Sequence, residues 1–314
     1  MMPERRGLLQ PGVGKEKRNI TTLGGSAMKN TCLSRREALR AAGAILGAGV
    51  PAHRDSSVWA APPKGRLNQA VARWCFNKIS LDDLCRAAAE MGIKAVDLVG
   101  PEDWPTLRKH GLTCSMTAGA GTIADGFNRK ENHDKLEREL RETIPRAAAA
   151  GLPNVITFSG NRRGLSDQEG LENCVAGLSR VKGIAQEHRV TICLELLNSK
   201  VDHKDYQCDH TAWGVDVVKR VDSPRVMLLY DIYHMQIMEG DVLRTIRQNI
   251  QWIGHFHTGG VPGRHELDDM QELNYGAIAR AIADTGFTGY VAHEFVPARD
   301  PLTSLKEAFR IFDV

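Results

Sequence analysis

The sequence predicts a single-domain α/β protein with the (β/α)8 TIM barrel fold, and three features of the chain after residue 60 support this prediction. Eight apolar runs of strand length recur between Ala70 and Phe295, and stretches with helical periodicity follow them. Strands that alternate with helices pair in parallel through right-handed crossovers, and eight such units in about 250 residues match a closed barrel. No GxGxxG motif follows the first strand, which disfavours a dinucleotide-binding sheet.

The expected elements follow from the spacing of apolar residues. The strands are expected at Ala70–Phe76, Ala95–Val99, Leu112–Thr117, Asn154–Phe158, Val190–Leu197, Val226–Ile232, Trp252–His257 and Tyr290–Phe295. The clearest helices are expected at Leu81–Met91, Lys135–Ala150, Asn173–His188, Ala212–Val221, Tyr275–Thr285 and Leu302–Phe312. Four glycines stand just before an expected strand, where a left-handed helix cap suits glycine: Gly92, Gly111, Gly151 and Gly286.

Residues 1–60 have the order of charged and apolar segments found in an export leader. Ser34–Arg40 is basic, Ala41–Ala52 is apolar and rich in glycine, and Val58–Ala60 offers small residues to a signal peptidase. The pair Arg35-Arg36 resembles a twin-arginine signal, which directs folded proteins across a membrane. The apolar run of 12 residues is too short to span a bilayer, so no permanent membrane anchor is expected.

We therefore expect a removable leader over residues 1–60, a barrel over residues 61–314, and export to the periplasm. Two points stay open at this level. Translation starts at Met1 or at Met28, and the segment His53-Arg54-Asp55 interrupts the run before the cleavage site. A basic N-terminus without leader function would leave the protein in the cytoplasm.

The net charge of +3 is unevenly distributed along the chain. Residues 1–60 contain ten of the 41 Lys and Arg and four of the 38 Asp and Glu, which leaves 31 basic and 34 acidic side chains after residue 60. A mildly acidic body lacks the basic face that nucleic acid requires, so we expect a small-molecule ligand. The oligomeric state stays open, and a homo-oligomer is compatible with the sequence.

The cysteines form no CxxC pair, and several lie within apolar runs. We expect them to be small core residues rather than disulfides or a thiol site. They are Cys32, Cys75, Cys85, Cys114, Cys174, Cys193 and Cys208.

Ionisable side chains occur at the carboxyl ends of the last four expected strands: Glu195, Asp231, His257 and Glu294. In a parallel barrel these ends share one rim, where the active sites of this fold lie. Three neighbouring buried carboxylates need a counter-charge, because an unpaired buried charge costs several kcal/mol, and no run of Lys or Arg accompanies them. One such residue alone more often makes ordinary hydrogen bonds, but four at corresponding positions predict a site for one divalent metal ion. The oxygen and nitrogen ligands suit Mn²⁺, Mg²⁺, Co²⁺ or Zn²⁺ without ranking them.

Six short motifs lie around these strand ends. They are Leu194–Asn198 (LELLN), Asp231–Gln236 (DIYHMQ), Ile253–His257 (IGHFH), Val261–Glu266 (VPGRHE), Leu273–Tyr275 (LNY) and Glu294–Pro297 (EFVP). Together they resemble the hydroxypyruvate isomerase group of the xylose isomerase-like barrels. The strings DIYHMQ and VPGRHE are the most specific, whereas the first half of the barrel contributes mainly the strand–helix pattern.

This resemblance implies that Glu195 and Glu294 are metal ligands and also the acid/base pair of an isomerase, and that Asp231 is a further ligand. The implied reaction moves a proton between adjacent carbons of a small hydroxy-carbonyl substrate, with hydroxypyruvate or tartronate semialdehyde as the best candidates. A divalent ion stabilises the developing enediolate, and each carboxylate contributes about 10²–10⁴-fold.

Four residues are candidates for substrate binding: Trp74, Asn198, His234 and Arg264. His234 either donates to the enediolate oxygen or orients Asp231 from behind. Arg264 either clamps a substrate carboxylate or fixes its loop through an ion pair with Glu266 or Asp268. Trp74, an aromatic residue on the first expected strand, either forms a wall of the substrate pocket or packs in the barrel core.

Two departures from the resembled group leave alternatives open. His257 stands where hydroxypyruvate isomerases often have Gln and the related ketose 3-epimerases have His, and the loop 199–206 is unusually charged. The alternatives are a ketose 3-epimerase or inosose dehydratase-like enzyme on the same scaffold and, in another class, an exported sugar-binding barrel without catalysis. A nuclease of this fold is disfavoured because it needs more histidines and a basic face.

Overall fold

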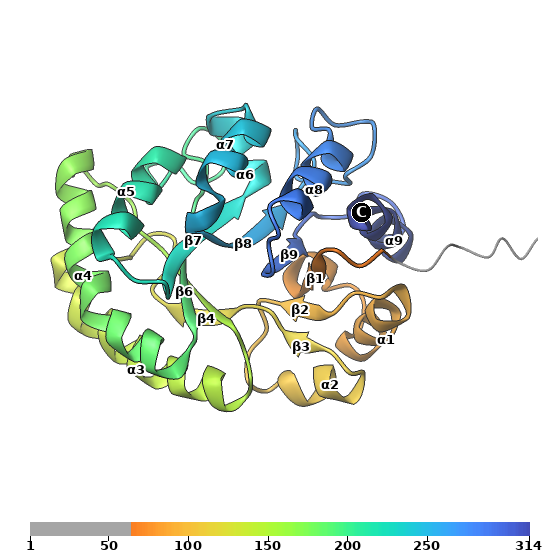
Figure 1. The fold of residues 1–314 in the computed structure, drawn as a ribbon, viewed down its shortest axis with the longest axis horizontal. Coiled ribbons are helices and arrows are strands. Elements are labelled where there is room, and N and C mark those ends of the chain that lie inside the picture. The colour runs from red at the N-terminus through yellow and green to blue at the C-terminus, as the bar shows by residue number, and fades with distance from the viewer. Residues whose placement is uncertain (1–63) are drawn as a thin grey trace, which may run out of the picture. The chain divides into compact units, whose positions relative to one another are not determined.

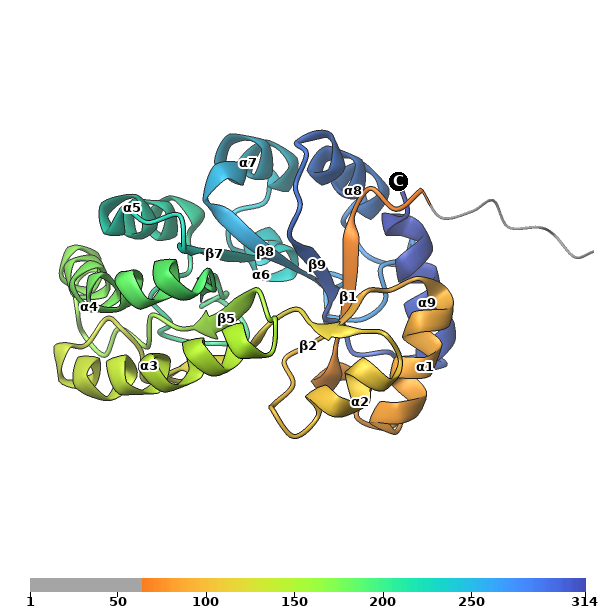
Figure 2. The same cartoon turned by 60° about the horizontal axis from the view of Figure 1, so that its bottom comes forward.

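A ring of parallel strands enclosed by helices makes up the described part of the chain, residues 64–314 of a computed structural model. Figures 1 and 2 show this arrangement from two directions. The predicted barrel fold is confirmed. The predicted leader lies outside the described residues, so export stays a prediction. No helix within residues 64–314 is long and apolar enough to cross a membrane.

The strands follow one another around the barrel in parallel. They are β1 (Asn68–Ala72), β2 (Ala95–Asp97), β3 (Thr113–Cys114), β4 (Thr117–Ala120), β5 (Asn154–Thr157), β6 (Thr191–Glu195), β7 (Val226–Asp231), β8 (Ile253–Thr258) and β9 (Tyr290–His293). Their order is β3-β2-β1-β9-β8-β7-β6-β5-β4. The expected third strand is divided, because β3 pairs with β2, β4 pairs with β5, and Ser115 and Met116 separate the two halves. Nine strand segments therefore provide the eight positions of the barrel.

The helices lie outside the ring. They are α1 (Leu81–Met91), α2 (Trp104–Lys109), α3 (His133–Ala149), α4 (Asp167–His188), α5 (Thr211–Val221), α6 (Ile232–Met238), α7 (Val242–Asn249), α8 (Tyr275–Asp284) and α9 (Pro301–Phe312), with short 3-10 helices at Arg73–Phe76, Lys130–Asn132 and Ile250–Trp252. Helix α4 starts before the expected Asn173 because Ser166 caps it, accepting a hydrogen bond from the Glu169 amide at 3.2 Å. A helical stretch was expected after each strand, but no bounds were predicted for α2, α6 or α7.

The four glycines expected at helix ends adopt left-handed backbone conformations. The φ angles of Gly92, Gly111, Gly151 and Gly286 are 100°, 73°, 77° and 75°. Such angles strain residues that have a Cβ atom but not glycine. The glycines therefore turn the chain from each helix back towards the next strand.

Alternation along the strands sorts the side chains into two layers. On β7, Leu228 and Tyr230 belong to the cluster that packs against the helices, whereas Leu229 belongs to a small cluster inside the barrel. Successive side chains on a strand point to opposite faces, so Asp231 shares the inward face with Leu229. The same alternation applies to β6, β8 and β9. It points the polar side chains near their carboxyl ends into the barrel interior.

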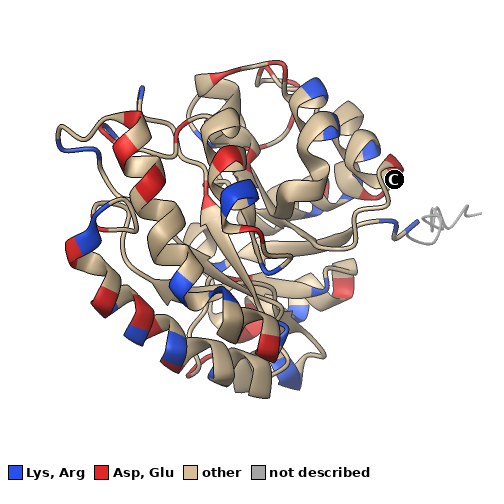
Figure 3. Cartoon of the chain, turned by 60° about the vertical axis from the view of Figure 1, so that its left-hand side comes forward, with Lys and Arg blue, Asp and Glu red and all other residues tan. Residues whose placement is uncertain are grey.

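Charged side chains on the helices and loops are mixed in sign. Figure 3 shows Lys and Arg interspersed with Asp and Glu along the outer helices in that view. Many of them pair locally, as Arg220 does with Asp216 at 2.8 Å. The six cysteines within residues 64–314 are free and buried, as predicted for core residues.

Two glycines of α4 give a matched test of how tightly helices α3 and α4 pack. A Cβ atom on Gly177 would lie 2.5 Å from Phe127 Cδ1 and 2.7 Å from His133 Nε2, whereas one on Gly183 would meet nothing within 4 Å. We expect Gly177→Ala to lower the free energy of unfolding by about 1–3 kcal/mol through overpacking. Gly183→Ala should raise it by up to about 1 kcal/mol through helix propensity. Urea denaturation measures both, and equal stability of the two variants would contradict this packing.

Candidate metal and active site

Four ionisable side chains converge at the carboxyl-end rim of the barrel. Glu195 ends β6, Asp231 ends β7, His257 lies near the end of β8, and Glu294 follows β9. Asp231 and His257 are direct partners in the β7–β8 register. One ligand atom from each of the four lies within 4.8 Å of those of the others. The structure thus brings together all four side chains predicted as ligands.

His257 stands at the centre of this cluster. Its Nδ1 atom lies 2.7 Å from Glu294 Oε2, 3.4 Å from Glu195 Oε1 and 4.0 Å from Asp231 Oδ2. None of the four residues is more than 5% exposed. Although Nδ1 is close to these oxygens, no hydrogen bond to it has acceptable geometry. A buried ring nitrogen that points at three carboxylates without a bond of its own is placed as a ligand atom would be.

The cluster concentrates more negative charge than burial tolerates. Burial raises the pKa of Glu195 to about 7 and raises the pKa of Asp231, against the charge of Arg264. Burial also acts to raise the pKa of Glu294, but the charges of His257 and Arg264 outweigh it and hold that pKa below its usual range. Burial would lower the pKa of His257, yet the neighbouring carboxylates raise it well above its ordinary value. The protein without a bound cation therefore keeps protons at this site.

Arg264, which the sequence placed among the substrate contacts, supplies a positive charge directly to the carboxylates of the cluster. Its guanidinium donates to Asp231 Oδ2 at 2.7 Å and to the Glu294 carboxylate, and it lies over the ring of Tyr233 at 4.8 Å. The predicted alternative, an ion pair with Glu266 or Asp268, is wrong, because those two carboxylates contact Arg299 instead.

His234 and Asn198 form a unit beside the cluster. Asn198 Oδ1 accepts hydrogen bonds from the backbone amides of Val201 and Asp202, which fixes its Nδ2 as the donor to His234 Nδ1 at 2.6 Å. Burial and the charge of Arg264 hold the pKa of His234 well below its usual value. Arg264 Nη1, which can only donate, lies 2.8 Å from His234 Nε2, so a donor faces each ring nitrogen and the two compete for the one lone pair of the neutral ring. Asn198 does not line the cavity, although the sequence placed it among the substrate contacts.

A cavity of about 550 Å³ opens beside the cluster. One side is polar and includes Glu195, Glu294, His234 and Arg264, and Trp74 joins it by donating from Nε1 to Glu294 Oε1 at 2.6 Å. The opposite side is apolar and is formed by Leu98, Ala118, Ile123, Ile156 and Phe158. The volume is within the usual range for small-molecule sites, about 300–1,000 Å³.

Sequence reasoning missed three polar residues of the site. Asp202 and His203 line the cavity from the loop after β6, whose charged character was noted but not located. Asp97 ends β2 and contacts His257 Nε2 at 2.8 Å. The strand-end rule that selected the four ligands would have found Asp97 had it been applied to the second strand, whereas no local pattern marks a loop residue as facing the cavity.

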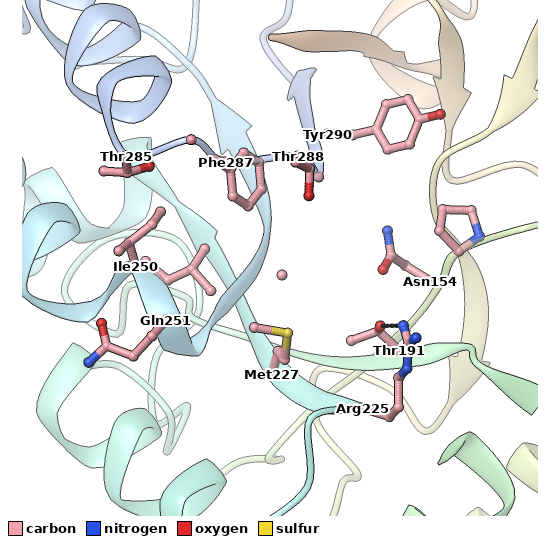
Figure 4. Close-up of a pocket in the computed structure, with 15 residues that line it drawn as sticks. Asn154, Thr191, Arg225, Met227, Ile250, Gln251, Thr285, Phe287, Thr288 and Tyr290 are labelled. Atoms are coloured by element: carbon pink, nitrogen blue, oxygen red, sulfur yellow. Dashed lines mark hydrogen bonds between the residues drawn. The ribbon is translucent and has the colours of Figure 1, made fainter. Parts of the chain in front are cut away.

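A second cavity, of about 470 Å³, lies at the other end of the barrel (Figure 4). Its walls include Asn154, Thr191 and Tyr290 from the first residues of β5, β6 and β9. Arg225 donates to Thr191 Oγ1 at 3.3 Å and is the one Lys, Arg, Asp or Glu among the described residues that line it. This end of the fold ordinarily serves stability rather than chemistry, so the ionisable cluster marks the candidate site.

A barrel with ionisable side chains gathered at its carboxyl-end rim has the architecture of a TIM-barrel enzyme. Residues 85–313 match the family described as Xylose isomerase-like TIM barrel. Because this match covers most of the chain, the protein belongs to that family.

Relatives of the chain carry isomerase names. A 2-oxo-tetronate isomerase of Haemophilus influenzae is 28% identical over 245 residues, which cover 73% of this chain and 93% of that protein. A Mus musculus protein provisionally named hydroxypyruvate isomerase is 24% identical over 257 residues, which cover 75% of this chain and 91% of that protein. The crystal structure of a family 2 AP endonuclease from Brucella melitensis has a TM-score of 0.67 and 25% identity, covering 76% of this chain and 97% of that one.

The raised pKa of Glu195 gives a testable pH dependence of stability in the metal-free protein. Its folded-state pKa of about 7 exceeds the ordinary value of 4.5, so the folded state alone holds this proton between about pH 4.5 and 7, and stability falls as the pH rises across that window and stays lower above it. Chelator-treated Glu195→Gln avoids this loss, and we expect it to be more stable than wild type by roughly 1–3 kcal/mol at about pH 8 but not at about pH 4.

Denaturant unfolding at the two pH values measures this difference. Glu187→Gln, at an exposed position of α4, serves as the control and should show none. A stability difference between Glu195→Gln and wild type that stays constant with pH would contradict the assignment.

Proposed function

We propose that the protein is a divalent-metal-dependent isomerase that moves a proton between adjacent carbons of a small hydroxy-carbonyl acid, with hydroxypyruvate or a 2-oxo-tetronate as the substrate class. The convergence of Glu195, Asp231, His257 and Glu294 on one buried point beside a cavity carries the proposal. The isomerase names of the relatives support the same reaction type.

The four side chains fit a divalent cation on chemical grounds. Three carboxylates and one ring nitrogen form a mixed donor set that suits Mn²⁺, Mg²⁺, Co²⁺ or Zn²⁺. The Nδ1 atom of His257 is buried and has no hydrogen-bond partner. His257 must be neutral to offer a lone pair to a cation, so Arg264 and a doubly charged ion would together match the three carboxylates in charge. Such an ion, when bound, stabilises negative charge that develops on adjacent substrate oxygens.

The protein's own groups supply the proton transfers. Glu195 and Glu294 reach the cavity from β6 and from the chain after β9, so a substrate between them has one carboxylate near each of two neighbouring carbons. One takes the C–H proton and the other returns a proton, a pairing that contributes on the order of 10²–10⁴-fold per group. His234 lines the cavity and donates its ring proton to the substrate oxygen. The apolar wall opposite excludes water from the reacting carbons.

Arg264 favours an acidic substrate over a neutral sugar. It is the one Lys or Arg among the described residues that line the cavity, and its guanidinium matches a carboxylate in geometry. The epimerase alternative rests on His257. A nuclease activity lacks support because charges on the described surface are mixed in sign (Figure 3).

Metal content and turnover of three variants test the reaction assignment. We expect Glu195→Gln and Glu294→Gln to lose bound metal and to lower kcat/KM for the acid substrates at least about 10²-fold. His234→Gln should keep stoichiometric metal while kcat falls about 10²-fold, because it removes a donor and not a ligand. Elemental analysis and a coupled isomerase assay give the two readouts. Full turnover in both glutamine variants would refute the acid/base pair.

The substrate class is tested by replacing the arginine of the cavity. Arg264→Met should raise KM for hydroxypyruvate or 2-oxo-tetronate about 10–100-fold, because it removes charge-assisted hydrogen bonds to the substrate carboxylate. The increase in KM should be smaller for any neutral ketose that the enzyme converts. Arg299→Gln is the matched control, because Arg299 pairs with Asp268 and Glu307 away from the cavity. A larger effect on the neutral ketose would favour the epimerase reading.

A further inference from the structure

We propose that Asp97 is a positioning residue for the metal site: it holds the proton of His257 on Nε2 and so presents the Nδ1 lone pair to the cation. This inference rests on the metal site of the proposed function and adds a residue from a different strand of the barrel. Asp97 does not line the substrate cavity, and among the four side chains of the cluster its contact is with His257, so its effect on the cluster passes through that ring.

The contact between the two side chains fixes which ring nitrogen carries the proton. His257 Nε2 lies 2.8 Å from Asp97 Oδ2, and both residues are completely buried. An ionised carboxylate only accepts hydrogen bonds, so Nε2 must donate. With the proton held on Nε2, Nδ1 is the nitrogen whose lone pair is available to a cation. A metal-bound histidine commonly donates its other ring nitrogen to a carboxylate in this manner.

Asp97 is itself held in place from the neighbouring strand. Ser115 donates from Oγ to Asp97 Oδ1 at 2.5 Å, and it lies in the two-residue gap between β3 and β4. The hydroxyl therefore fixes one oxygen of the carboxylate, and the other oxygen faces His257 Nε2 at 2.8 Å and His255 Nε2 at 3.3 Å. The gap between β3 and β4 thus contains Ser115, the residue that orients Asp97.

A competing reading makes Asp97, His255 and His257 a cation site of their own. One ligand atom from each lies within the same 4.8 Å limit, and neither ring nitrogen of His255 has a hydrogen-bond partner. That site would take the Nε2 lone pair of His257 and turn its Nδ1 proton towards Glu294. The two sites therefore compete for one imidazole. The position of Nδ1 among three carboxylates favours the cluster, which has four ligands rather than three.

Metal affinity of the full barrel tests the inference directly. Chelator-treated wild type, Asp97→Asn, Ser115→Ala and Thr117→Val are titrated with Mn²⁺ by calorimetry. We expect Asp97→Asn to weaken Mn²⁺ binding about 10–100-fold and Ser115→Ala to weaken it several-fold, about 3–10-fold, with one ion per chain throughout. Thr117→Val removes a buried hydroxyl that donates to the Val99 carbonyl at 2.9 Å, away from Asp97, and should leave the affinity unchanged.

A second readout follows the proton itself. In ¹⁵N-edited NMR spectra, His257 of the Zn²⁺-loaded wild type should show a slowly exchanging, downfield Nε2–H resonance. In Asp97→Asn this resonance should move upfield and exchange faster. If Asp97→Asn does not fold, the Mn²⁺ affinity and the Nε2–H resonance of Ser115→Ala test the role of Asp97 instead.

Unchanged Mn²⁺ affinity in folded Asp97→Asn and in Ser115→Ala, or two ions per wild-type chain, would overturn the inference. Failure of the proposed function appears differently. Wild type that binds Mn²⁺ but isomerises none of the acids would contradict the reaction and leave the role of Asp97 supported by affinity and NMR. Wild type that takes up neither Mn²⁺ nor Zn²⁺ would contradict both.

Discussion

Burial of three carboxylates around one imidazole is the constraint on which the rest of this site depends. Glu195, Asp231 and Glu294 arrive on separate strands, and each is almost inaccessible to water. Desolvation of buried carboxylates disfavours their charged forms. The side chains that contact them therefore supply positive charge or hydrogen-bond donors. Arg264 reaches across its loop to two of the carboxylates, Trp74 donates to one of them, and His257 lies between all three.

Arg264 occupies a position that gives it two uses. It neutralises Asp231 and Glu294 while its Nη1 faces Nε2 of His234, whose Nδ1 faces the amide donor of Asn198, so two donors compete for one lone pair. A cation among the carboxylates would remove the reason for this arrangement and free the guanidinium for a substrate carboxylate. Metal and acidic substrate would then each favour binding of the other, as reciprocal linkage requires. A chain of hydrogen bonds continues from the cluster into the barrel interior, because His257 contacts Asp97 and Asp97 accepts from Ser115.

The sequence predicted those features that follow from short-range periodicity. The eight strand positions, most helices, and the convergence of the four ionisable side chains follow from alternation along strands and from the rule that parallel strand ends share a rim. The break at Ser115 and Met116 was not predictable, because apolar residues continue through it. The contacts of Arg264 were also out of reach: it lies 33 residues from Asp231 in the chain, and only the path of its loop decides between Asp231 and the nearer Glu266. Asp202 and His203 belong to a loop without periodicity, where side-chain direction depends on tertiary hydrogen bonds.

The proposed function requires one doubly charged ion among the acidic side chains of the barrel mouth. Crystals grown with Mn²⁺ and measured on both sides of the manganese absorption edge locate that ion independently of any activity. We expect a single strong anomalous peak per chain. It should lie about 2.0–2.3 Å from Nδ1 of His257 and from oxygens of the three carboxylates, Glu195, Asp231 and Glu294. The guanidinium of Arg264 should then be displaced from Asp231. A peak bound instead through Nε2 of His257, or no peak at the cluster while Arg264 keeps its contacts, would contradict this proposal.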